Sequence, residues 1–184
     1  MAQNSPWQAR FVVQLTKDSR SEFVVEVHPD WAPIGAQRFR DLIDAKYFEN
    51  CRIYRVLPGF ISQFGIPASP AAWEKWGANK IKDDPFGVQG NQRGYLSFAT
   101  SGPNARGSQI FVNLVDNRES LDPQNMFAPF AKVVTGMNEC VERFFSGYTE
   151  ANQKPDQLAA KQFGNDYFEQ EFPQLSYIVS VEIL

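Results

Sequence analysis

Residues 54–65 read YRVLPGFISQFG, and this stretch determines how the chain around it is interpreted. Two runs of β-branched and aromatic residues flank Pro58 and Gly59, a pair that is typical of a tight turn. The stretch therefore predicts a β-hairpin with short arms.

Two polar side chains stand among the apolar residues of this hairpin, Arg55 on the first arm and Gln63 on the second. Alternation along a strand predicts that Gln63 shares a face with Ile61, opposite to Phe60. A buried Arg or Gln without a hydrogen-bond partner costs a large amount of free energy, so both must be bonded or lie at a wet surface. From the residues alone, a functional site and a structural Arg bonded to a backbone carbonyl both remain open.

Outward from the hairpin, short apolar runs alternate with Gly and Pro turns. They predict strands at residues 11–15, 23–27, 53–56, 61–64, 95–99, 109–114, 130–134 and 177–183. Helical spacing of apolar residues predicts one helix with Pro29 and Pro33 at its start. It predicts a second helix over residues 137–145, with Thr135 as its N-cap. Many short strands with two helices favour a barrel or sandwich, because closure removes exposed sheet edges.

Two stretches look like polar excursions over the surface, residues 67–92 and residues 146–162. The first contains a mixed charge run that predicts a solvated surface: Lys80, Lys82, Asp83 and Asp84. Neither stretch resembles a linker, so residues 1–184 are expected to form a single domain.

Composition excludes several classes of function. The 184 residues carry a formal net charge of −3, which does not fit a nucleic-acid-binding protein. No apolar run is long enough to cross a membrane, and the N-terminus lacks a signal pattern, so a cytoplasmic location is expected. A single histidine and two cysteines, Cys51 and Cys140, argue against zinc or Ser-His-Asp chemistry, and both thiols are predicted to be buried.

A second stretch, residues 98–113, reads FATSGPNARGSQIFVN. In their content, order and spacing, this stretch and residues 54–65 resemble the two signature stretches of the cyclophilins, and the similarity extends from about Phe11 to Ile183. The resemblance implies a mainly β fold, a closed eight-stranded antiparallel β-barrel capped by two α-helices.

The resemblance also implies a function, peptidyl-prolyl cis–trans isomerisation of X–Pro bonds in client proteins, with no cofactor and no metal ion. Arg55 matches the catalytic arginine, and Gln63 matches the residue that orients it. Eight further positions match the substrate groove: Phe60, Ile61, Ala99, Thr100, Gln109, Phe111, Leu121 and Phe127. The expected partners are proline-containing peptides and client proteins, without nucleic acid or membrane, and the protein is expected to be a monomer.

The chain departs from the family pattern at the rim of the groove. Ser120 stands where many cyclophilins carry a Trp that helps to bind cyclosporin, so weak cyclosporin binding is expected. The stretch over residues 122–133 lacks a common His, so Asn125, Met126 or Phe127 is expected to take its place at the rim. Of these, Phe127 is the residue expected to pack on the proline ring. These departures leave an alternative open, a module that binds proline peptides with negligible turnover.

Overall fold

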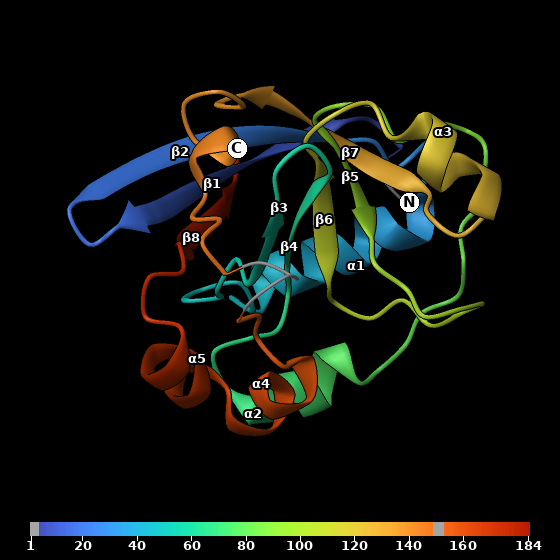
Figure 1. Cartoon of the computed structure of the whole chain (residues 1–184). Coiled ribbons are helices and arrows are strands. Elements are labelled where there is room, and N and C mark those ends of the chain that lie inside the picture. The colour runs from blue at the N-terminus through green and yellow to red at the C-terminus, as the bar shows by residue number, and fades with distance from the viewer. Residues whose placement is uncertain (1–3, 149–152) are drawn as a thin grey trace.

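The computed structural model describes residues 4–148 and 153–184. Eight antiparallel strands form one sheet in the order β3-β4-β6-β5-β7-β2-β1-β8 (Figure 1). The strands are β1 (Trp7–Thr16), β2 (Ser19–Val27), β3 (Arg55–Leu57), β4 (Ile61–Phe64), β5 (Tyr95–Phe98), β6 (Ile110–Asn113), β7 (Pro129–Thr135) and β8 (Tyr177–Ile183). Each predicted strand is present, with ends that differ by a few residues.

The long β1–β2 hairpin shows why alternation predicted the strands. Every second side chain is buried from Ala9 to Leu15 of β1 and from Phe23 to Val27 of β2, and the ladder pairs Phe11 with Phe23. The two rings stack with centroids 4.6 Å apart, and Phe11 also packs near Phe39 of the first helix. One face of this hairpin therefore lies on the core, and the other faces solvent.

The expectation of a closed barrel was wrong, because the curled sheet has two ends, β3 and β8, which no ladder joins in the described part of the chain. The ends approach each other only through the residues before β3, where an isolated bridge pairs Arg52 with Tyr177. The Asn50 N–H donates to Ile178 O, and the Ile53 N–H donates to Ser176 O. β3 is only three residues long, and the residues that approach β8 precede it in the chain. The sheet is therefore a curled half-barrel.

Helix α1 (Pro33–Asp44) covers the core as expected, and its N-terminus is bonded from a distant loop. The N-cap residue Ala32 has no side chain that can accept a hydrogen bond, but the Asp84 carboxylate accepts from the backbone N–H groups of Ile34 and Gly35. Asp84 is 2% exposed and also accepts a 2.9 Å hydrogen bond from Arg106. The interpretation of the charge run as a solvated surface was therefore wrong for Asp84, since a helix end and an arginine both require its carboxylate.

The second expected helix, over residues 137–145, was also wrong. Thr135 ends β7, Gly136 has a φ of 84°, and only Val141–Arg143 form a short 3₁₀ helix, η3. A Cβ at Gly136 would lie 2.3 Å from Glu22 O, so the tight turn with positive φ at this position requires glycine. The apolar spacing is real, but an irregular turn is enough to bury Cys140 and Val141.

The described chain contains more helices than the two expected. They are α2 (Pro70–Ala72), the π-helix η1 (Trp73–Gly77), α3 (Arg118–Leu121), the 3₁₀ helix η2 (Asp122–Gln124), α4 (Gln157–Phe163) and α5 (Asn165–Glu171). Figure 1 shows α2, α4 and α5 together at one side of the sheet. They surround a second apolar cluster that includes Tyr54, Trp73 and Phe168, so the two predicted surface excursions in fact build part of the core. No described helix is long and apolar enough to cross a membrane.

Candidate active site

A cleft of about 380 Å³ is lined in part by residues of β3, β4 and β6. All ten site residues predicted from the sequence line it: Arg55, Phe60, Ile61, Gln63, Ala99, Thr100, Gln109, Phe111, Leu121 and Phe127. The structure thus brings together residues from four separate stretches of the chain.

One end of the cleft is apolar. Ile61, Phe111 and Leu121 form a small buried cluster that is separate from the main core, and Phe60, Ala99 and Phe127 pack against it. The rings of Phe111 and Phe127 meet edge to face, with centroids 5.5 Å apart. This arrangement suits a small apolar ring that inserts between aromatic side chains.

The centre of the cleft is polar, and strand pairing explains why. The β3–β4 ladder pairs Arg55 directly with Gln63, and the β4–β6 ladder pairs Gln63 with Phe111. Direct partners in an antiparallel ladder project from the same face of the sheet, so the three side chains lie in one row. Arg55 Nη1 donates a 3.2 Å hydrogen bond to Gln63 Oε1.

Tyr54 was missed in the sequence analysis, although it adjoins Arg55. Its hydroxyl accepts a 2.7 Å hydrogen bond from Gln63 Nε2 and donates to Gln109 Oε1. Gln63 Nε2 also donates to Gln109 Oε1, at 3.0 Å. The only sequence signal was a phenol within an apolar strand, and a buried phenol needs a hydrogen-bond partner.

Phe60 corrects the prediction from alternation, which placed it on the face opposite to Ile61 and Gln63. All three residues line the same cleft. The strand β4 begins at Ile61, and Phe60 belongs to the preceding turn, where its backbone N–H donates to Leu57 O. Alternation constrains residues within a strand, so it does not apply to Phe60.

The loop over residues 99–109 forms one wall of the cleft and is held from behind. Arg106 is 2% exposed, with Nη1 bonded to Asp84, and the Asn104 N–H donates to the Asp83 carboxylate at 3.0 Å. On the cleft side, the Ala99 N–H donates to Gln109 O, and Thr100 Oγ1 donates to Gly102 O at 2.7 Å. The polar residues of this signature stretch therefore fix the wall, while small side chains face the cleft.

The other end of the cleft is basic, a feature that no pattern in the sequence predicted. Trp73, Lys80, Gln157 and Lys161 line it, and all four come from the stretches interpreted as surface excursions. Partial burial lowers the pKa of Lys80 and of Lys161, and the two ammonium groups are close enough for Lys161 to lower the pKa of Lys80 further. No local motif marks these residues, because the chain brings them together only through the packing of α4 against α2.

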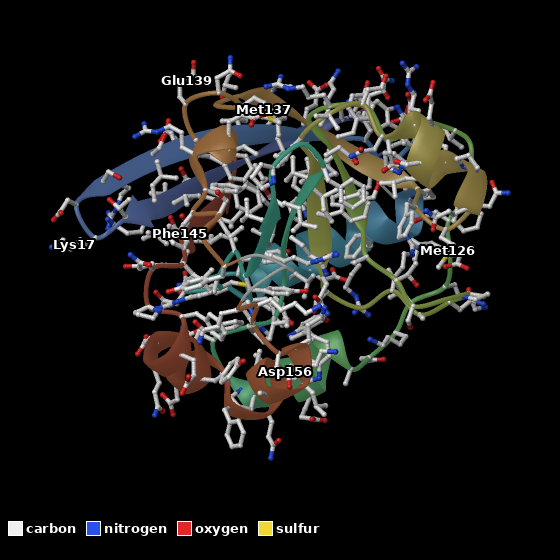
Figure 2. All side chains as sticks on the ribbon, in the orientation of Figure 1. Lys17, Met126, Met137, Glu139, Phe145 and Asp156 are labelled. Atoms are coloured by element: carbon white, nitrogen blue, oxygen red, sulfur yellow. The ribbon has the colours of Figure 1, made fainter. Side chains whose placement is uncertain are left out.

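Ser120 does not line the cleft. Leu121 lines the cleft, but its neighbour Ser120 is exposed, and its hydroxyl donates to Asn117 O at 3.2 Å. Met126, which precedes Phe127, lies on the loop between α3 and β7 (Figure 2). Within the described residues, no group of three His, Cys, Asp or Glu side chains is placed to hold a metal ion.

Comparison with known proteins gives a consistent family match. The family described as "Cyclophilin type peptidyl-prolyl cis-trans isomerase/CLD" matches residues 12–160. "Peptidyl-prolyl cis-trans isomerase-like 3" of Dictyostelium discoideum is 31% identical over 125 residues, which are 65% of this chain and 73% of that protein. "Peptidyl-prolyl cis-trans isomerase-like 1" of Aspergillus fumigatus is 29% identical over 143 residues, which are 74% of this chain and 84% of that protein.

Solved structures agree on the fold. A cyclophilin-type peptidyl-prolyl cis-trans isomerase of Cryptosporidium parvum superposes with a TM-score of 0.70 at 19% identity, covering 98% of each chain. A second structure of that protein, in the presence of the dipeptide Ala-Pro, has a TM-score of 0.68 at 19% identity and covers 96% of this chain and 98% of that chain. At this level of identity the superposition supports the architecture alone.

Proposed function

The chain belongs to the cyclophilin-type peptidyl-prolyl cis-trans isomerases, and from this we propose that its cleft accelerates rotation about X–Pro bonds, with Arg55 as the catalytic residue. The substrates are exposed proline-containing segments of client proteins. The observation that carries the proposal is the direct contact of Arg55 with Gln63 beside the apolar end of the cleft.

The chemistry needs only one well-placed donor. Amide resonance creates a barrier of about 18–20 kcal/mol to rotation about a peptide bond. In the twisted transition state the resonance is lost, and the prolyl nitrogen regains a lone pair that can accept a hydrogen bond. A guanidinium near this nitrogen stabilises the transition state more than the planar ground state, and this difference accelerates the reaction.

The apolar residues are proposed to hold the proline ring. Phe60, Phe111, Leu121 and Phe127 offer aromatic and aliphatic surface at the place where the row of Arg55 and Gln63 ends. A ring buried there is anchored while the acyl side of the bond rotates, and exclusion of water strengthens the hydrogen bond from Arg55. The structure of the Cryptosporidium parvum protein of similar fold was determined in the presence of the dipeptide Ala-Pro, so a peptide that contains Ala-Pro is a suitable first ligand to test.

The test is an NMR exchange measurement on an Ala-Pro-containing peptide with the wild-type protein and with Arg55→Ala. We expect the wild type to accelerate exchange between the two isomers and the variant to lose most of this acceleration while it remains folded. Arg20→Ala, a change of the same type on the exposed side of the β1–β2 hairpin, is the matched control.

Two outcomes would contradict the proposal. Acceleration that survives in Arg55→Ala would exclude the arginine mechanism. Binding of the peptide by the wild type without any acceleration would instead favour the alternative function, a module that binds proline peptides.

A further inference from the structure

Two lysines from distant parts of the chain contact one tryptophan at the basic end of the cleft. Lys80 Nζ lies 5.4 Å from the centre of the Trp73 ring, and Lys161 Nζ lies 4.7 Å from it. Trp73 itself is only 8% exposed, so the ring is a fixed platform and not a mobile surface group. Contacts of this kind hold an ammonium group in place while part of it remains open to solvent.

No acidic side chain in the described lining of the cleft balances the charges of Lys80 and Lys161. The whole chain, in contrast, carries a net charge of −3. None of the ion pairs between described residues includes either lysine, and the only hydrogen bond of Lys80 Nζ is a 2.9 Å donation to Gly77 O.

A third cation lies behind the two lysines. Arg38 is 9% exposed, and its Nη1 donates to the carbonyl oxygens of Trp76, Asn79 and Gly107. These bonds tie the loop that carries Lys80 to the wall of the cleft. The guanidinium charge of Arg38 also contributes to the lowered pKa of Lys80. Positive potential therefore accumulates at this end of the cleft, and low-dielectric walls focus it.

A chain of amide side chains links the basic end to the polar centre. Gln109 Oε1 accepts from Gln63, and Gln109 Nε2 donates a 3.2 Å hydrogen bond to Gln157 Oε1 at the start of α4. Gln157 and Lys161 lie four residues apart on α4, so they project from the same face of that helix. An extended peptide rises about 3.3 Å per residue, so a segment that leaves the proline site can place a side chain at this end within a few residues.

We propose that Lys80 and Lys161, held on Trp73, select substrates with an acidic side chain one to three residues before the proline. The proposal rests on the function proposed above, because it requires an X–Pro segment bound in the cleft. The residues before the proline would then lie along the wall formed by Ala99 and Thr100 and reach the basic end beyond it. The carboxylate of the substrate supplies the negative charge opposite Lys80 and Lys161 that the described lining of the cleft does not contain.

The test compares blocked peptides that differ at one position, with Ala, Glu or Lys placed one, two or three residues before the proline, or two residues after it. Exchange between isomers is followed by NMR, because a coupled protease would add a charge preference of its own. At low salt, two partly exposed lysines should give a ratio of kcat/KM for Glu over Lys peptides of about 5 to 10 at one of the preceding positions. At 1 M salt, where the Debye length is about 3 Å, the ratio should fall to about 2 or less.

Charge variants assign the preference to the two lysines. In Lys80→Gln/Lys161→Gln the Glu-over-Lys ratio should fall to about 1, and in Lys80→Glu/Lys161→Glu it should invert, since the sign of the local potential is reversed. Misfolding lowers the rates for both peptides in the same proportion, so it cannot invert their ratio. Lys17→Gln is the matched control, because Lys17 lies at the tip of the β1–β2 hairpin, far from α4 and Asp156 (Figure 2), and should leave the ratio unchanged.

Failure of this proposal can be distinguished from failure of the proposed function. Normal acceleration of the Ala peptide with a ratio near 1, or with a ratio that the charge variants do not change, would overturn the acidic preference alone. If no peptide is accelerated, the isomerase proposal fails. The acidic preference is then tested by the ratio of the affinities for Glu and Lys peptides, measured by NMR titration. Equal affinities for Glu and Lys peptides would overturn it.

Discussion

Gln63 Nε2 donates a 2.7 Å hydrogen bond to the Tyr54 hydroxyl, and this bond fixes which end of the Gln63 amide faces Arg55. An amide can be turned end for end, which would present an N–H to the guanidinium in place of an oxygen. With Nε2 bound by Tyr54 and Gln109, Oε1 is left to accept from Arg55. Tyr54 therefore acts on the arginine through Gln63.

Tyr54→Phe should lower kcat by about 3- to 10-fold with little change in KM, because the lost hydrogen bond is worth about 0.5–1.5 kcal/mol and positions a transition-state donor. The phenyl ring should keep the packing of Tyr54 on Phe168, whose centroid is 6.2 Å away. The measurement is the dependence of NMR exchange rates on peptide concentration. Tyr177→Phe on β8 is the control, and an equal loss there, or a change in KM alone, would argue against a positioning role.

Arg55→Lys should lose most of the activity, although the positive charge is kept. A lysine ammonium is a point charge on a flexible stem, whereas the planar guanidinium can donate to Gln63 and to a second acceptor at the same time. Peptide affinity from NMR titration should change less than the rate. A lysine variant with a rate close to that of the wild type would show that charge alone is sufficient.

The carboxylate of Asp84 connects three parts of the fold, the loop before β5, the start of α1 and Arg106 of the cleft wall. Asp84→Asn should lower the free energy of unfolding by about 3–5 kcal/mol, because it removes the closer of the two carboxylates that face the buried Arg106 guanidinium and leaves only Asp83, at 3.8 Å. Urea denaturation measures this change. Asp18→Asn, in the exposed turn after β1, should change it by less than about 1 kcal/mol.

Asp84 and Lys80 also show what the sequence could and could not predict. Both belong to one polar run, but Asp84 is buried beneath α1, and Lys80 lines the cleft. Local patterns predicted the strands and the row of Arg55 and Gln63, because hairpin geometry alone places these two side chains together. The contacts of Lys80 and Lys161 with Trp73 depend on how distant helices pack, and no local period encodes that packing.

The sequence also could not predict whether the two ends of the sheet pair, because this too depends on residues that are distant in the chain. Alternation predicts that residues 53–56 and 177–183 are extended, but it does not determine which residues pair across the last gap. The pairing uses Arg52 and its neighbours, which precede β3, so the two end strands stay unpaired in the described structure. The prediction of a second helix was wrong because apolar spacing over nine residues is compatible with a turn that begins at Gly136 as well as with a helix.

Ser120→Trp should strengthen inhibition by cyclosporin by about 10-fold, since an indole at the rim can cover apolar ligand surface worth about 1.5 kcal/mol. Ser120 is exposed and precedes Leu121, so the larger side chain can be accommodated at this position without disturbing the core. Inhibition of NMR exchange by increasing cyclosporin measures the effect. The same substitution at Glu119, one residue further from the cleft, is the control, and equal gains at both positions would point to non-specific binding.

Stability should fall as the pH rises above about 9, because two buried thiols must keep their protons in the folded state. Burial raises the pKa of Cys51 to about 12 and that of Cys140 to about 11, from an ordinary value of 9.0, and burial also raises the pKa of Tyr47. Above pH 9 the unfolded chain loses these protons first and is stabilised, so stability present below pH 9 is lost progressively toward pH 12.

At pH 10 this linkage should cost roughly 1 kcal/mol per cysteine relative to pH 7, which urea denaturation at a series of pH values can measure. Cys51→Ala should be less stable at pH 7, because it loses the hydrogen bond to Ile66 O, but its stability should decline less steeply between pH 9 and pH 10. An equal slope in the variant and the wild type would mean that Cys51 is not the group responsible. Rapid labelling of both thiols in the native protein at pH 8 would contradict the raised pKa values directly, since only the thiolate reacts.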